Sequence, residues 1–212
     1  MNLEPLVPSF RPDGSVFDLA NVQQHDIVWT EIAGALSRIA RFNGRCSGIG
    51  FSVAQHCVMG ADALFVETGD AVLSGIFLLH DAEEGLTGDV TRPTMSLLGV
   101  YLSRTHGVAA RAVSAAMSAA KADLHRAIHE RAGLPPLENL PDYARQVKDM
   151  DDRMLRAEAI ALFGSQAALH CPAADRPAPR LTGAIRAWAA MKAEEAWLER
   201  LNRYLGIEWR GA

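Results

Sequence analysis

The sequence predicts an all-α protein, and three observations support this. Apolar residues recur at helical spacing in most segments, no segment alternates apolar and polar residues as a half-buried strand does, and no internal repeat is visible. At 212 residues the chain is long enough for one domain with a substantial core. We therefore expect a helical bundle in residues 25–170. An extended N-terminal arm (1–24) precedes it, and a loop and a helix (171–212) pack on the same domain.

The N-terminal arm contains several prolines and Gly14, which predict an extended chain with a short hairpin around residues 12–15. The first helix begins near Asp26, where apolar residues start to recur at helical spacing. It runs out at residues 41–44, so we expect Arg41 at its C-terminal end.

The second helix is predicted from a capping box formed by Ser52 and Gln55. Apolar residues from Val53 to Phe65 supply its buried stripe, and His56 flanks that stripe. This histidine is the first residue of the chain with both a ligand-type side chain and a predicted place near the core.

The third helix is the segment around which the rest of the chain is organised. Residues 71–79 are almost all apolar, and the run ends abruptly in His80, Asp81, Glu83 and Glu84. A helix that is apolar on every side lies inside a domain. A carboxylate at its end needs a partner, a shifted pKa or a metal. The alternative is that the helix simply ends there, with its acids in water and His80 a hydrogen-bonded core residue.

Further helices are expected after a glycine-containing loop at residues 85–93. An alanine-rich helix covers residues 107–132, and a second helix, capped by Asp142, extends to about Phe163. A loop at 172–179 then leads to a last helix, indicated by Ile185, Trp188, Met191, Ala196 and Leu201.

Helical spacing selects one acid of the helix that ends at Phe163. Asp151 falls on the apolar stripe with Val147, Met154 and Glu158, so we expect it to point inward. Asp152 is the reserve candidate. Asp149 shares a face with Arg145, Arg153 and Arg156 and is expected to be solvated.

Composition excludes several classes of function. The formal charge of −4 gives no general attraction to nucleic acid or to anionic lipid, so an anionic ligand must be bound locally. Cys46, Cys57 and Cys171 lack the spacing of a disulfide framework or a zinc knuckle, and the first residues do not resemble a signal peptide. We expect a cytoplasmic protein that binds neither a membrane nor a nucleic acid duplex.

Three separate helices thus each place a ligand-type side chain at or beside a buried stripe: His56, His80 with Asp81, and Asp151. Two imidazoles and two carboxylates suit a borderline divalent ion such as Co, Mn, Zn, Ni or Fe, and they leave coordination positions open. An open metal site of this kind indicates chemistry more than structure.

The order H…HD…D resembles that of the HD-domain metal-dependent phosphohydrolases. The similarity is strongest to the 5′-deoxynucleotidase branch and to phage-encoded deoxynucleotide hydrolases. Four segments within residues 35–162 carry it: ALSRIARFNG, FSVAQH, LLHDAEEGLTGDV and VKDMDDRMLRAEAIAL. The resemblance implies an HD-domain helical bundle. The phage-like first segment also makes a deoxynucleoside triphosphate hydrolase an alternative.

The resemblance also implies roles for individual residues. Glu84 is the expected acid/base residue of the reaction, and Arg41 the clamp on the phosphate. Phe42 stands where the bacterial nucleotidases have tryptophan, and Met95 where a lysine often follows the proline. The full implied set is His56, His80, Asp81 and Asp151 as metal ligands, Glu84, Asp81 and Asp151 in catalysis, and Arg41, Phe42, His56, Asp89 and Thr91 in substrate binding.

The same chemistry follows from the residue types alone. A divalent ion acidifies water and neutralises charge on phosphoryl oxygens. Glu84, about one helical turn beyond His80, is placed to orient water or to protonate a leaving oxygen if burial raises its pKa. Arg41 offers a planar fork to a phosphate.

We therefore expect a phosphohydrolase that dephosphorylates deoxynucleoside monophosphates and forms a homo-oligomer. One alternative is a triphosphohydrolase, for example on dATP, with Mg²⁺ as a candidate ion for the phosphate chain. A second alternative is a non-catalytic module that binds a nucleotide or a metal.

Simpler roles remain open for several residues. Arg41 is also explained as an ordinary cation at a helix C-terminus, and Asp89 as a turn-former. His125 and His129, with Glu130, have metal-ligand spacing but are expected on an exposed helix. Cys57, Trp188 and Trp197 are expected to be packing residues.

Overall fold

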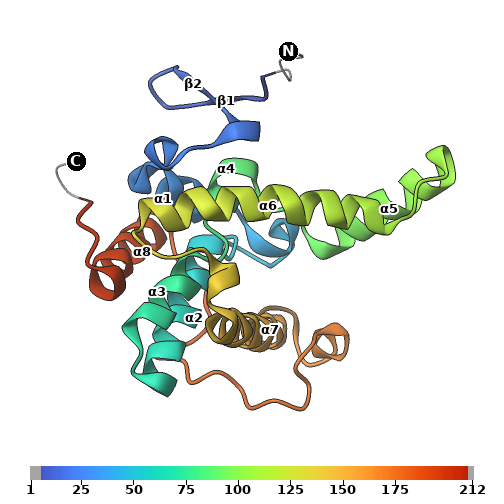
Figure 1. Cartoon of the computed structure of the whole chain (residues 1–212). Helices are drawn as coiled ribbons and strands as arrows, with labels where there is room; N and C mark the ends of the chain where they lie inside the picture. Colours follow the sequence, from blue (N-terminus) through green and yellow to red (C-terminus); the bar gives the residue numbers. More distant parts are fainter. Residues whose placement is uncertain (1–5, 210–212) are drawn as a thin grey trace.

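The computed structural model describes residues 6–209, and its fold is all-α (Figure 1). A small antiparallel hairpin, β1 (Pro8–Phe10) and β2 (Val16–Asp18), comes first, in the register Ser9 to Phe17. The hairpin expected around residues 12–15 is therefore present. Arg11 attaches the hairpin to the helical body, because its guanidinium pairs with Asp26 at 3.0 Å and with Glu31 at 3.2 Å.

The helices follow in the order α1 to α8. Their bounds are α1 (Trp29–Arg38), α2 (Val53–Thr68), α3 (Ala71–Leu79), α4 (Glu84–Thr87), α5 (Arg92–His106), α6 (Arg111–Arg131), α7 (Pro141–Phe163) and α8 (Ala190–Leu205). None of these helices combines the length and the apolar character needed to cross a membrane.

The core is built around α2 and α3, which pack closely against each other. Gly60 of α2 makes this approach possible, because a Cβ at this position would lie 2.1 Å from the ring of Phe77 on α3. Helix α8 contributes Trp197, which is fully buried and lies 6.3 Å from the ring of Trp29 on α1. The C-terminal helix thus shares one apolar core with α1, α2 and α3.

Several predicted boundaries near α1 and α2 were wrong. Helix α1 ends at Arg38, and Arg41 lies beyond it in a short 3-10 turn (Arg41–Gly44). The chain turns there because Ala40 pairs with Ser52 in an isolated β-bridge. Ser52 does cap α2 by accepting from the Gln55 backbone N–H at 3.2 Å. The side chain of Gln55 instead contacts the backbone at residues 186 and 188, so the predicted capping box is only half formed.

Later boundaries also differ. Helix α5 was not predicted, because its exposed apolar residues give no single buried stripe. Asp142 lies in the first turn of α7 rather than capping it. The last helix begins at Ala190, so Ile185 and Trp188 precede it, and Met191 is 82% exposed rather than packed.

Candidate metal centre

The structure brings together the four residues that the sequence singled out. His56 comes from α2, His80 and Asp81 from the end of α3, and Asp151 from α7. His56 Nε2 lies 3.4 Å from His80 Nε2 and 3.6 Å from Asp151 Oδ1. Asp81 Oδ2 lies 3.3 Å from His80 Nε2 and 3.8 Å from His56 Nε2. Each carboxylate therefore places one oxygen within 3.9 Å of both Nε2 atoms, and we call these four residues the His–Asp cluster.

The second nitrogen of each imidazole is already held by the protein. His56 Nδ1 lies 2.6 Å from Glu158 Oε1, and both side chains are completely buried. His80 Nδ1 donates to the backbone carbonyl of Phe77 at 2.7 Å. Each ring therefore keeps a proton on Nδ1 and turns Nε2 toward the cluster, which is how carboxylates and carbonyls orient metal-binding histidines.

The donor set fits a divalent ion. His56, His80 and Asp151 each offer an atom within 4.8 Å of the others, and Cys57, His80 and Asp81 form a second such group. Burial raises the pKa of the Cys57 thiol to about 11, so Cys57 stays protonated and is the poorer ligand. Burial lowers the pKa of His80, but the charge of Asp81 and a hydrogen bond to Asp151 raise it well above its ordinary value. The cluster therefore favours an added positive charge.

Arg41 lies against the cluster although it is not at the end of α1. Its Nε donates to Glu158 Oε2 at 3.0 Å, and its Nη1 lies 3.6 Å from Asp81 Oδ2. The side chain is 13% exposed. This excludes the explanation of Arg41 as a solvated cation at the C-terminus of that helix, because its guanidinium faces two buried or half-buried carboxylates.

Glu158 is the residue that the sequence analysis placed correctly but gave no role. It connects His56 to Arg41 and is fully buried. Burial raises its pKa, yet the charges of Arg41 and His56 outweigh that effect, and the pKa is lowered. The sequence did contain a signal for this role, because Glu158 is an acid two turns beyond Asp151 on the same apolar stripe.

The phase predicted for α7 is confirmed for Asp151. Its Oδ1 faces the histidines, while its Oδ2 lies 3.4 Å from Arg92. Asp152 turns away from the cluster and pairs with Lys148. Asp149 pairs with Arg176 at 2.8 Å outside the cluster, as expected for a solvated position.

Arg153 differs from its predicted place on a solvated face. It is 7% exposed and makes a two-bond contact with Glu67 of α2, at 2.8 and 2.7 Å. The guanidinium therefore attaches α7 to the C-terminal end of α2.

Glu83 and Glu84 are adjacent buried carboxylates with opposite environments. Burial raises the pKa of Glu83, but His125 and Lys121 outweigh it and lower the value to about 2. Burial and the charge of Asp81 raise the pKa of Glu84 to about 8, against a weaker opposing effect of Lys121. Two neighbouring acids whose pKa values are driven apart are typical of acid/base sites.

Lys121 and His125 reach these acids from α6. Lys121 Nζ lies 2.7 Å from Glu83 Oε1 and 3.4 Å from Glu84 Oε1, and His125 Nε2 lies 2.9 Å from Glu83 Oε2. His129 is also buried, and it hydrogen-bonds the carbonyl of Pro135 at 2.8 Å. The expectation that this part of α6 is exposed was wrong, since Leu124, Ala127, Ile128 and His129 in its C-terminal half are buried. No sequence pattern had indicated a role for Lys121.

Of the remaining predicted substrate contacts, Asp89 and Phe42 lie near Arg41. Asp89 is half-buried, and burial raises its pKa while nearby Arg41 opposes this. The Thr91 hydroxyl contacts that of Thr94 at 2.9 Å, at the start of α5. Phe42 adopts a positive φ of 56° and packs edge-on against Phe163 at 5.2 Å. Trp197 is a packing residue, as expected, and Cys57 is fully buried.

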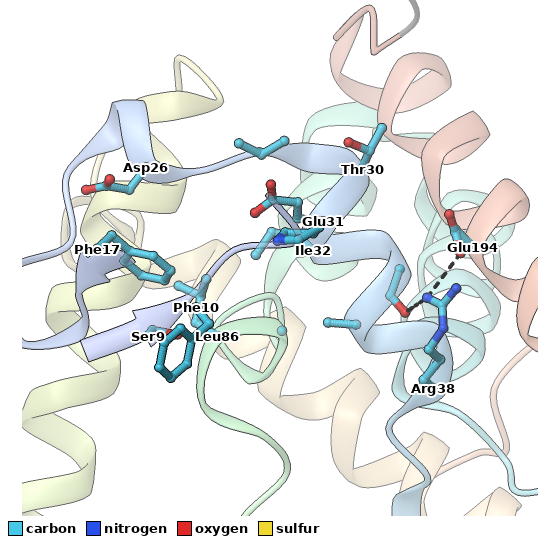
Figure 2. A pocket seen from close by; sticks show the side chains of 15 residues that line it. Ser9, Phe10, Phe17, Asp26, Thr30, Glu31, Ile32, Arg38, Leu86 and Glu194 are labelled. Carbon is cyan, nitrogen blue, oxygen red and sulfur yellow. Dashed lines mark hydrogen bonds and ion pairs between the residues drawn. The ribbon is translucent and has the colours of Figure 1, made fainter. Parts of the chain in front are cut away.

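A pocket of about 520 Å³ lies elsewhere, between the N-terminal hairpin and α1 (Figure 2). Phe10 and Phe17 border it from the hairpin, and Leu86 borders it from α4. No residue of the His–Asp cluster lines this pocket. Gly85 and Leu86, which follow Glu84 in the chain, are among its lining residues.

Two curated proteins are similar to this chain in sequence. The uncharacterized protein YfdR of Escherichia coli (strain K12) is 31% identical over 145 residues. The match covers 68% of this chain and 66% of YfdR, just under two thirds of that protein's length. The uncharacterized protein RCAP_rcc00048 of Rhodobacter capsulatus is 29% identical over 156 residues, which cover 71% of this chain and 70% of that protein. No model of a protein family matches the chain.

Proposed function

We propose that the chain is a divalent-metal-dependent phosphohydrolase that removes phosphate from deoxynucleoside monophosphates. One observation carries the proposal. A cluster suited to a divalent cation lies beside a buried carboxyl that keeps its proton at neutral pH and beside a buried guanidinium. A cation, an acid and an anion-binding group are together what hydrolysis of a phosphate ester requires.

His56, His80, Asp81 and Asp151 are the proposed ligands of the ion. When bound, a divalent ion of the Co, Mn, Zn, Ni or Fe type supplies a Lewis acid for phosphoryl oxygens and lowers the pKa of water. Glu158 and the Phe77 carbonyl keep the two imidazoles in the tautomer that this role needs.

Arg41 and Glu84 are the proposed groups that act on the substrate. Arg41 binds the phosphate, since its guanidinium lies beside the His–Asp cluster, 3.6 Å from Asp81 Oδ2. Water attacks phosphorus, and the bond from phosphorus to the 5′ oxygen breaks. Glu84 gives its proton to that leaving oxygen and takes one back from the solvent once the alcohol has left. Its raised pKa keeps the proton available at neutral pH.

A triphosphohydrolase, for example acting on dATP, is the second candidate. Two exposed cations favour it: Arg92 lies 3.4 Å from Asp151 Oδ2, and Lys148 lies 3.8 Å from the same atom. Both side chains are about 60% exposed, so they are free to turn toward a phosphate chain that extends beyond the cluster. Mg²⁺ is the proposed additional ion in that case.

The third candidate is a module that binds a metal or nucleotide without catalysis. Such a module needs the His–Asp cluster but has no use for a buried, protonated Glu84. Burying an acid at this position costs stability, because one of its oxygens, Oε2, has no hydrogen-bond partner, and a module that only binds gains nothing in return.

The experiment is to incubate metal-loaded protein with deoxynucleoside mono- and triphosphates and to identify the products. Inorganic phosphate from monophosphates supports the first proposal, and tripolyphosphate from triphosphates supports the second. Metal binding with no product from either substrate class would leave only the binding module. Glu84→Gln is the matched control for contaminating phosphatase activity.

A further inference from the structure

Cys57 is a buried thiol beside the His–Asp cluster that the proposed reaction does not use. Its side chain is fully enclosed, and it forms no disulfide. His56 precedes it on α2, so the two side chains leave the helix about 100° apart. His56 turns toward Asp151 on α7. Cys57 turns instead toward the end of α3, where a side-chain hydrogen bond links it to His80.

The thiol completes a second group of possible metal ligands. The Cys57 sulfur, a His80 nitrogen and an Asp81 oxygen all lie within 4.8 Å of one another. Ligand atoms on one tetrahedral ion are about 3.5 Å apart, because metal–nitrogen and metal–sulfur bonds are about 2.0 and 2.3 Å long. Closing a pair of atoms from 4.8 Å to that distance takes about 1 Å of side-chain movement. Neither His56 nor Asp151 belongs to this group.

This group shares His80 and Asp81 with the His–Asp cluster, and the sharing makes the two positions alternatives. His80 Nδ1 donates to the carbonyl of Phe77 at 2.7 Å, so Nε2 is the nitrogen left for a metal. The single lone pair of that nitrogen binds one ion at a time. An ion held by Cys57, His80 and Asp81 therefore takes the place of an ion in the His–Asp cluster.

The chemistry of the donors decides which ion takes which position. Imidazoles and carboxylates alone suit a harder ion such as Mn²⁺, whereas a thiolate favours thiophilic ions such as Zn²⁺ and Cd²⁺. When such an ion binds, the S–H bond breaks, a metal–sulfur bond forms and the proton leaves to the solvent. The thiolate and Asp81 then balance the two charges of the ion, as Asp81 and Asp151 do in the His–Asp cluster.

We propose that Cys57, His80 and Asp81 form an alternative position for a thiophilic divalent ion, which competes with a harder ion in the His–Asp cluster. Cys57 is then the residue that sets the metal preference of the centre. This inference rests on the metal-binding part of the proposed function and not on phosphate hydrolysis. Its tests therefore measure binding and spectra rather than turnover.

The first test titrates Cd²⁺ into metal-free protein in a Cys171→Ser background, which removes the partly exposed thiol. Cd²⁺ should bind and give the ultraviolet charge-transfer band of a metal–thiolate bond. Cys57→Ser should abolish this band. It should also lower Cd²⁺ affinity by at least ~10-fold, the lower end of the effect of losing even an outer partner of a metal. Cys57→Ala repeats the test without a buried hydroxyl.

The matched control is Cys46→Ser. Cys46 is also a buried thiol, but it belongs to none of the ligand groups found among the described residues. This variant should keep both the band and the Cd²⁺ affinity. Mn²⁺ affinity should be the same in the parent protein, in Cys57→Ser and in Cys46→Ser, because the harder ion does not use the sulfur.

A second test separates the two positions. His56→Ala removes a ligand of the His–Asp cluster that the alternative position does not use. Mn²⁺ binding should therefore be lost, while Cd²⁺ still binds and keeps its charge-transfer band. In the parent protein, Cd²⁺ should displace bound Mn²⁺ one for one.

Four results would overturn the proposal. They are Cd²⁺ bound without the band, a band that survives Cys57→Ser, Cd²⁺ and Mn²⁺ bound together in one chain, and loss of both ions in His56→Ala. Calorimetry with each ion distinguishes these from failure of the proposed function. If the folded parent protein binds neither Cd²⁺ nor Mn²⁺, this inference and the metal-binding basis of that function are both wrong.

Discussion

The two sides of the candidate site are built on opposite principles. On the ligand side, His56, His80 and Asp151 face one another, and each imidazole is fixed through its second nitrogen. On the acid side, formed by α4 and α6, Lys121 and His125 lie against Glu83, and Glu83 and Glu84 each keep a buried Oε2 without a hydrogen-bond partner. The first side is arranged to hold a cation, and the second to hold a proton. Metal binding and proton transfer should therefore be separable by mutation.

The largest expected effect is on the ligand side. Asp151→Asn should lose most metal affinity and with it turnover, because the amide replaces a charged ligand oxygen that faces both histidines. Asp149→Asn is the matched control on the same helix and should keep both. Metal content by mass spectrometry and phosphate release measure the two quantities. Metal loss in the Asp149 variant with retention in the Asp151 variant would reverse our assignment.

The sequence was sufficient to predict that these four side chains lie together, and the reason is physical. His56, Asp151 and the His80–Asp81 pair each border an apolar stripe, and helical periodicity places such stripes against a common core. The position of Arg41 was harder to predict from the sequence. The first helix ends early at the β-bridge between Ala40 and Ser52, which is a contact between residues distant in the chain.

Other parts could not be predicted. Lys121 and His125 act on α4 through packing between distant segments, and an alanine-rich helix with few large apolar residues gave no indication of its buried face. Helix α5 escaped prediction because its apolar residues point away from the body, so no single buried stripe marks it. Glu158 lay on the predicted stripe, but its partner His56 is 102 residues away.

On the acid side, Glu84→Gln should separate chemistry from binding. Turnover should fall by about 10²–10⁴-fold, the range that general acid/base groups supply, while metal and nucleotide still bind. Gln keeps the size of the side chain and removes the transferable proton. Steady-state kinetics and metal analysis of the same preparation check both parts.

Two results would argue against this role of Glu84. Loss of metal in the Gln variant would make Glu84 a ligand or a structural residue. Unchanged turnover would transfer the acid/base role to another residue of the site, with Asp89 ranked before Glu83, since Gly85 and Gly88 allow the loop of Asp89 to fold over the cluster.

Glu158→Gln should give a smaller effect on the ligand side. It weakens the hold on His56 Nδ1 and on Arg41, and outer partners of this kind are worth about 10–100-fold in metal affinity. Calorimetric titration of Mn²⁺ or Co²⁺ into metal-free protein measures the change. Glu67→Gln, which alters a carboxylate that pairs with Arg153 away from the cluster, is the control. Equal affinities in the Glu158 variant and the wild type would remove Glu158 from the site.

The smallest expected effect concerns the pH dependence of stability in metal-free protein. The pKa of Glu84 is raised to about 8 in the folded state, so its contribution to stability is full below about pH 4.5 and is lost as the pH rises through 8. Relative to Glu84→Gln, the wild type should therefore lose about 1 kcal/mol of unfolding free energy between pH 7 and 9. Urea unfolding at both pH values checks this. A difference between the two proteins that does not change with pH would contradict the raised pKa.

The most direct test of the central claim is the metal content of the purified protein and of a His56→Ala, His80→Ala double variant. We expect close to one tightly bound transition metal per chain in the wild type, because four ligand-type side chains converge on one point. The double variant should hold none and should be inactive, while its circular dichroism keeps the helical spectrum. Full metal occupancy in the folded double variant would show that the His–Asp cluster is not the metal site.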